Sequence, residues 1–224
     1  AMQLGIVFEA LNEDDSAELV YKEVLRDRPE YKPAIDRLLA ILLRRSKLGE
    51  MERMISDIHE TLPDNAHYYD WEARLWEARD NIPDMLVARK KAVELAPSEP
   101  RYLQSFLSAL SAAGQYKAVL QATEPYMNRR GFNWVSPIRA TALVRLNRTE
   151  DAEQLYLNSL ASSPPQFVML HAKEMMAAYG ADTAIEKCRK WLNGGLKSWQ
   201  AYLELGMLYS EAENLDEAVK ALTE

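Results

Sequence analysis

Cysteine, histidine and glycine are scarce in this sequence. Its 224 residues include one cysteine, three histidines and eight glycines. A single thiol, Cys188, excludes an intramolecular disulfide framework and any multi-cysteine metal site, so we expect it to be a small buried filler. Long apolar runs are missing as well, because the longest clear one, Leu38 to Leu43, is far too short to span a bilayer. We therefore expect no membrane insertion within this chain.

An excess of positive charge is also lacking. The chain has 27 basic and 34 acidic side chains, which gives a formal net charge of −7. Binding to a phosphate backbone requires a basic surface, so this balance argues against nucleic acid as a partner. The short basic pair Arg44-Arg45 is expected to lie on a solvated face.

No arrangement of residues typical of catalysis or metal binding is present. The histidines His59, His67 and His171 are scattered, and neither a His-Glu-x-x-His motif nor a glycine-rich phosphate loop occurs. His171 and Glu174 have the spacing of two ligands on one helix but lack the further ligands that a zinc site needs. The sequence therefore predicts no metal, no other cofactor and no enzymatic activity.

A fixed period is the feature that the sequence does have. Pro29, Pro63 and Pro97 are 34 residues apart, and each follows an apolar stretch with helical spacing. A period of this size is typical of a solenoid built from one repeated supersecondary unit. Because proline fixes φ and lacks an N–H donor, each of these prolines is expected to end one helix before the next unit begins.

The same kinds of residue recur at the same offsets from these prolines. Small residues stand where the two helices of a unit should cross closely, and aromatic or long apolar residues stand where stacked units should fill the space between them. These offsets hold Leu4, Gly5, Phe8, Ala17, Tyr21 and Val24 in the first unit, Ala140, Leu143, Ala152, Tyr156 and Pro164 in the fifth, and Tyr202, Leu205, Gly206, Tyr209, Ala218 and Leu222 in the last.

This pattern resembles the tetratricopeptide repeat family, and the resemblance covers nearly all of the chain. It implies an all-α fold, namely a right-handed superhelical solenoid of antiparallel helix pairs that forms a single domain of about seven repeats. We place the repeats at 1–31, 32–65, 66–99, 100–132, 133–166, 167–198 and 199–224.

Several repeats depart from the pattern. Repeat four is one residue short near Gly114 and carries Pro125 inside its expected second helix, which should kink or end there. Repeat six is short, with a tight turn at Gly180 and a stop at Gly194. Both ends of the chain fall inside a repeat, so we expect an excised segment of a longer protein.

Five tryptophans divide into two groups. Trp76 occupies a packing offset and Trp191 lies on a second helix, so both are expected in the core. Trp71, Trp134 and Trp199 lie off the main packing offsets. They either cover neighbouring helices or, in the case of Trp71 or Trp134, line a binding surface, where aromatic residues are favoured anchors.

The concave wall of such a solenoid is lined by the first helix of each pair. In the resembled family, ligands are contacted by first-helix side chains that do not serve packing. A mixture of charge with arginine and tryptophan suits a peptide-binding groove. Projected onto this sequence, the groove positions are Asp36, Arg37, His67, Asp70, Trp71, Arg74, Arg101, Gln104 and Trp134.

These features predict a protein–protein interaction scaffold that binds a peptide segment or helix of a protein partner in its concave groove. One alternative is the non-catalytic arm of a larger enzyme, such as a glycosyltransferase, or of an envelope-assembly protein. Another is self-association into a homo-oligomer through the open ends or the groove. A cytoplasmic location is favoured over a periplasmic one, because nothing in the sequence points to a secretory lumen.

Overall fold

A computed structural model describes residues 1–127, 129–132, 134–159, 165–194 and 198–223, without the side chains of 156–159, 165–167, 170, 171, 174 and 178. The part of the chain so described is helical and contains no β-strand. It divides into two compact units, Ala1–Phe106 and Leu107–Glu224, and the boundary falls inside one helix.

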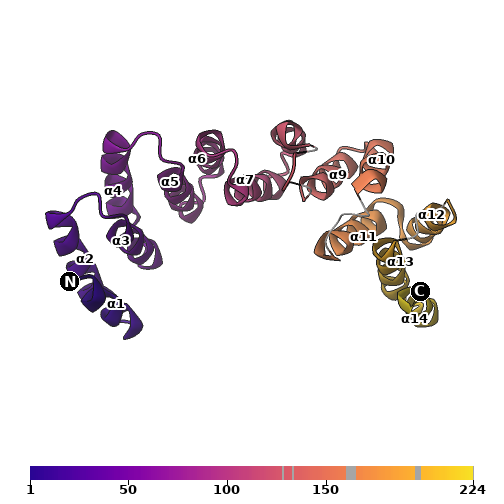
Figure 1. The fold of residues 1–224 in the computed structure, drawn as a ribbon, viewed down its shortest axis with the longest axis horizontal. Helices are drawn as coiled ribbons and strands as arrows, with labels where there is room; N and C mark the ends of the chain where they lie inside the picture. The colour runs from indigo at the N-terminus through magenta and orange to yellow at the C-terminus, as the bar shows by residue number, and fades with distance from the viewer. Residues whose placement is uncertain (128, 133, 160–164, 195–197, 224) are drawn as a thin grey trace. The chain divides into compact units, whose positions relative to one another are not determined.

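The first unit is a row of antiparallel helix pairs (Figure 1). In each pair the odd-numbered helix is the first helix and the even-numbered one the second. The second helix of one pair packs on the first helix of the next, as α2 does on α3 and α4 on α5. The helices are α1 (Met2–Ala10), α2 (Asp14–Asp27), α3 (Lys32–Arg44), α4 (Leu48–Thr61), α5 (Ala66–Ala78), α6 (Ile82–Leu95) and the start of α7 (Pro100–Ala112).

The second unit, taken by itself, is also built from helix pairs, with one interruption. Helix α8 ends at Thr123, and a single 3₁₀ turn that contains Pro125 follows it. The expected break of the second helix of repeat four at this proline is confirmed. The elements are α8 (Tyr116–Thr123), η1 (Glu124–Tyr126), α9 (Val135–Arg145), α10 (Thr149–Ser159), α11 (Pro165–Tyr179), α12 (Ala181–Asn193), α13 (Trp199–Glu211) and α14 (Leu215–Thr223).

One backbone conformation marks the turn between the two helices of every pair. A residue with φ between 55° and 76° occupies this turn, and the first four such residues are 34 positions apart and the others 33. A left-handed residue ends a helix by returning the next N–H to an earlier carbonyl, as Asn81 N does to Trp76 O at 2.9 Å. This spacing displays the repeat directly. The residues are Asn12, Ser46, Asp80, Gly114, Asn147, Gly180 and Glu213.

The small residues lie where the sequence places them, at close helix crossings. A β-carbon on Gly5 would collide with the buried ring of Tyr21, and one on Gly206 would lie 2.6 Å from Leu222 Cγ. Ala17 is fully buried on the helix that faces Gly5. The two helices of these pairs can therefore approach closely only because the first helix carries no side chain at the crossing.

Most of the other core expectations are confirmed, and one is wrong. Cys188 and Trp191 are buried in the core of the second unit, and helix α12 ends before Gly194 as expected. Trp76, however, is only half-buried, because its ring lies near the surface beneath the Arg79 guanidinium, 5.2 Å away. Pro164 and the side chains of Tyr156, His171 and Glu174 fall outside the described residues.

Candidate functional site

The first helices of the first unit carry most of the residues that the sequence projects into a groove. Helix α3 contributes two, α5 four and the start of α7 two. We call this set the first-helix face. It consists of Asp36, Arg37, His67, Asp70, Trp71, Arg74, Arg101 and Gln104.

Asp36 joins two first helices of the face. Its carboxylate on α3 lies 2.5 Å from His67 Nε2 and accepts a hydrogen bond from Trp71 Nε1 at 3.1 Å, both on α5. Burial raises the pKa of Asp36, but the bonds from His67 and Trp71 outweigh that effect and leave the pKa lowered. The carboxylate is therefore ionised, and it fixes the Trp71 ring, most of which is buried.

Two exposed arginines of the face lie on aromatic rings. The guanidinium of Arg74 sits 4.6 Å from the centre of the Trp71 ring and pairs with Asp70 at 2.9 Å. That of Arg101 sits 4.4 Å from the centre of the Tyr102 ring and hydrogen-bonds the Tyr102 hydroxyl. A contact of this kind between a guanidinium and a ring restricts a long side chain.

The other groove residues predicted from the sequence, Arg37, Gln104 and Trp134, lie in different environments. Arg37 pairs with Glu9 at 2.8 Å, and the same Glu9 oxygen accepts from the Tyr21 hydroxyl at 2.5 Å. Burial together with Glu9 raises the pKa of Tyr21 to about 12. The ion pair with Glu9 means that Arg37 links α3 to the first repeat. Gln104 is exposed on α7. Trp134 belongs to the second unit, where it is half-buried with its ring centre 6.0 Å from that of Phe132.

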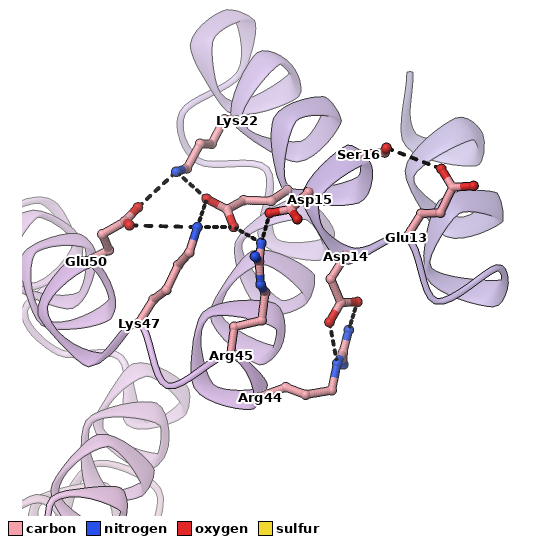
Figure 2. Close-up of polar contacts among 10 residues, drawn as sticks. Glu13, Asp14, Asp15, Ser16, Lys22, Arg44, Arg45, Lys47 and Glu50 are labelled. Atoms are coloured by element: carbon pink, nitrogen blue, oxygen red, sulfur yellow. Dashed lines mark hydrogen bonds and ion pairs between the residues drawn. The ribbon is translucent and has the colours of Figure 1, made fainter.

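A polar network that the sequence did not predict connects repeats one and two (Figure 2). At its centre Glu18 is 5% exposed on α2 and accepts from Lys22 at 2.6 Å and from Lys47 at 2.8 Å. Arg45 lies 3.3 Å from the same carboxylate, and Lys22 also reaches Glu50 at 2.9 Å. Burial raises the pKa of Glu18, but the bonds from the lysines outweigh it, so the pKa is lowered.

Arg44 is exposed, as expected for a solvated face, whereas Arg45 is only partly exposed, and both side chains make ion pairs. Arg44 Nε donates to Asp14 at 2.9 Å, and Arg45 pairs with Asp15 as well as with Glu18. These side chains are held by acidic residues of the preceding repeat.

The Glu18–Arg45 ion pair recurs one repeat period later in the chain. Glu52 lies one period after Glu18, and Arg79 lies one period after Arg45. Glu52 and Arg79 form the equivalent ion pair at 2.7 Å. Matching charges across a period would therefore have located this contact in advance.

The described side chains hold no metal site and the described helices no membrane span. No three His, Cys, Asp or Glu residues among them come close enough together to bind a metal ion. None of the helices so described combines the length and the apolar character that crossing a bilayer requires.

Comparison with known proteins adds to this geometry. No protein-family sequence model matches the chain, and no curated protein matches it by sequence. Among solved structures, a tetratricopeptide repeat protein from Parabacteroides merdae ATCC 43184 matches with a TM-score of 0.58 and 13% identity, over 98% of this chain and 88% of that one. The chain has the tetratricopeptide repeat fold.

Two further structures share this tetratricopeptide fold. A chain in the structure of Naa15/Naa10 bound to HypK-THB gives a TM-score of 0.59 at 15% identity over 98% of this chain, which spans 35% of that chain's length. The MamA protein gives 0.55 at 15% identity, over 71% of this chain and 87% of that one. Identities this low establish a common fold and nothing about partners.

Proposed function

We propose that this chain is a protein-interaction scaffold and that its first-helix face binds an extended peptide or a helix of a partner protein. The tetratricopeptide fold points to interaction with proteins in general. The observation that carries the more specific proposal is the pair of exposed guanidiniums, Arg74 and Arg101, held on the rings of Trp71 and Tyr102. The proposal assigns no catalytic role to the chain.

Pre-organisation is the physical reason why this face suits recognition. Ordering a long side chain on binding costs about 0.5 to 1.5 kcal/mol, and stacking on a ring removes part of that cost beforehand. Behind the arginines, the bonds from His67 and Trp71 to Asp36 hold α3 against α5. A guanidinium has five N–H donors, so one fixed in this way can still bind a carboxylate or a main-chain carbonyl of a peptide through its other donors.

Selection from a displayed library of random peptides tests the proposal without a known partner. The wild-type chain should enrich a peptide family, and the variant Arg74→Ala/Arg101→Ala should bind those peptides at least about tenfold more weakly, because two charge-assisted contacts are lost. The measurement is the dissociation constant of synthesised peptides by fluorescence anisotropy.

A matched control separates the face from net charge. Arg26 on α2 and Arg53 on α4 are both exposed on second helices, so Arg26→Ala/Arg53→Ala removes the same charge from elsewhere in the first unit. This control should bind like the wild type, and far-UV circular dichroism should be unchanged in both variants. Equal binding by the wild type and Arg74→Ala/Arg101→Ala would refute the proposed face.

A further inference from the structure

A cleft in the second unit lies among α12, α13 and α14. Its volume is about 400 Å³, and Tyr202, Leu205 and Tyr209 of α13 contribute to its lining. Helix α12 adds Leu192, and the charged side chains at the cleft come from α12 and α14. Sites for small ligands are concave, have volumes of this order, and combine apolar walls with a few polar groups. The cleft therefore has the size and the composition of a binding site.

The cleft opens on a side of the helix pairs that a following repeat does not cover. Lys220 of the cleft lies seven residues after the left-handed residue Glu213. The residues at this position in the first five repeats are all exposed, although another helix pair follows each of them. They are Leu19, Arg53, Val87, Gln121 and Gln154. The exposure of Lys220 at the opening is thus a feature of these helix pairs wherever they stand in the row.

Tyr209 is the side chain that distinguishes this cleft. It is 5% exposed, and its hydroxyl is buried without a hydrogen-bond partner among the described residues. The position lies four residues before the left-handed residue, and none of the other six repeats carries a hydroxyl there. Their residues are Phe8, Leu42, Trp76, Leu110, Leu143 and Met176. Because a buried hydroxyl that makes no hydrogen bond is unfavourable for folding, packing alone does not account for a tyrosine at this position.

Two cations and one carboxylate lie at the same cleft. Lys220 Nζ lies 2.6 Å from a Glu217 oxygen, whereas Arg189 Nη2 lies 3.7 Å from that carboxylate, which is too long for a hydrogen bond. The Arg189 guanidinium lies 5.3 Å from the centre of the Tyr209 ring. Glu217 balances only one of the two positive charges, so the cleft keeps one in excess beside the ring that carries the buried hydroxyl.

We propose that this cleft binds a carboxylate that is attached to an apolar or aromatic group. The carboxylate accepts a hydrogen bond from the Tyr209 hydroxyl and pairs with Arg189, while the apolar part lies against Leu192 and Leu205. Arg189 and Lys220 are long, exposed side chains, so they can move to let the carboxylate reach the hydroxyl. Such a ligand supplies the acceptor for the hydroxyl and the negative charge for Arg189.

Two sources carry a group of this kind, namely a free aromatic acid and the last residue of a peptide chain that ends in a large apolar side chain. Both present the same carboxylate to Tyr209 and Arg189, and they differ only in what lies outside the cleft. The cleft shares no residue with the first-helix face, so this proposal and the proposed function can be tested separately and can fail separately.

Isothermal titration calorimetry with 3-phenylpropionate and with a peptide that ends in phenylalanine tests the proposal. The wild-type chain should bind at least one of them. The matched amides, 3-phenylpropanamide and the C-terminally amidated peptide, should bind at least about tenfold more weakly, because the charge is lost. Binding of the free acid assigns a small molecule to the cleft, and binding of the peptide alone assigns a chain end. Binding of neither, or equal binding of acid and amide, overturns the proposal.

Single substitutions locate the binding in the cleft. Tyr209→Phe removes only the hydroxyl and Arg189→Gln removes the charge, so each should weaken binding at least about fivefold. Lys190→Gln is the matched control, because it removes the same charge from an exposed position of α12 that does not line the cleft. This control should bind like the wild type.

Thermal melting separates binding from a structural role of the hydroxyl. The melting temperature of Tyr209→Phe without ligand should be unchanged or higher, because a buried hydroxyl without a partner is removed. Unchanged binding by Tyr209→Phe overturns the proposal, and a lower melting temperature in the same variant would then show that the hydroxyl serves the fold instead.

Discussion

The first helix pair, α1 with α2, and the last, α13 with α14, share an interior and differ on the outside. Both have a glycine at the helix crossing, Gly5 or Gly206, and a left-handed residue in the turn. They differ on the second helix, because Glu18 of the first pair is buried against Arg45 and Lys47 of the next repeat, whereas Val219 at the same position of the last pair is exposed. The small residues and the turn make a helix pair, and the outer positions decide what can pack next to it.

The largest expected effect on stability comes from removing the Glu18 carboxylate, whose position in the last pair is held by Val219. Glu18→Ala should lower the free energy of unfolding by about 2.5 kcal/mol, because the charge-assisted bonds that Lys22 and Lys47 donate to this buried carboxylate are lost. Val219→Ala, at the same position of the last pair, should change it by less than about 0.5 kcal/mol, since that side chain is mostly in solvent. Urea denaturation followed by circular dichroism measures both values.

Lowering the pH should reduce the difference in stability between the wild type and Glu18→Ala. The pKa of Glu18 is lowered from its ordinary value of 4.5 in the folded state, so its stabilising effect is complete above that pH and is lost as the pH falls through the lowered value. The gap between wild type and Glu18→Ala should therefore be full at neutral pH and shrink below pH 4.5. A gap that is independent of pH would contradict the role given to this carboxylate.

The two crossing glycines should respond unequally to a methyl group. Gly5→Ala should cost about 2 kcal/mol by overpacking, because the Tyr21 ring is buried and held by Glu9. Gly206→Ala should cost less than about 1 kcal/mol, because the half-exposed Leu222 can rotate away and alanine favours the helix. Thermal and urea unfolding of both variants test this ranking. Equal losses would show that Tyr21 is not the fixed partner.

The smallest effect concerns the turns of the same two pairs. Glu213→Gly should raise the free energy of unfolding by about 0.5 to 1 kcal/mol, because glycine adopts the positive φ of 58° without steric cost. Asn12→Gly should raise it by less, about 0.3 kcal/mol, because asparagine tolerates this conformation better than glutamate. The comparison is again made by urea denaturation. A loss of stability in Glu213→Gly would contradict this account of the turn.

The fold could be predicted from the sequence because local rules and the period agree. Pro29 and Pro125 act through backbone geometry alone, so their effect on helix ends can be predicted without knowing the neighbours. Gly5 was placed at a helix crossing because the small residue recurs at the same repeat offset as Ala140 and Gly206. Trp76 was misplaced because its repeat position alone did not show that it would lie near the surface beneath Arg79, which depends on packing between neighbouring residues.

The candidate site could be predicted less completely. The repeat offsets predicted the helix of every groove residue except Trp134, which precedes α9 as its N-cap, and Arg74 and Arg101 are exposed on their helices. The offsets could not predict that Asp36 binds Trp71 and His67, since this contact joins side chains more than 30 positions apart. Nor could they predict that Arg37 pairs with Glu9, because which of several carboxylates a long side chain reaches depends on how the helices pack.

The single thiol of the chain has an experimental consequence. Cys188 is fully enclosed by the core of the second unit, and burial raises its pKa far above the usual range for a thiol. A disulfide reagent can therefore react with it only during rare opening of the surrounding helices. The labelling rate in native buffer would report the opening equilibrium of the C-terminal half alone, without mutation or an attached probe.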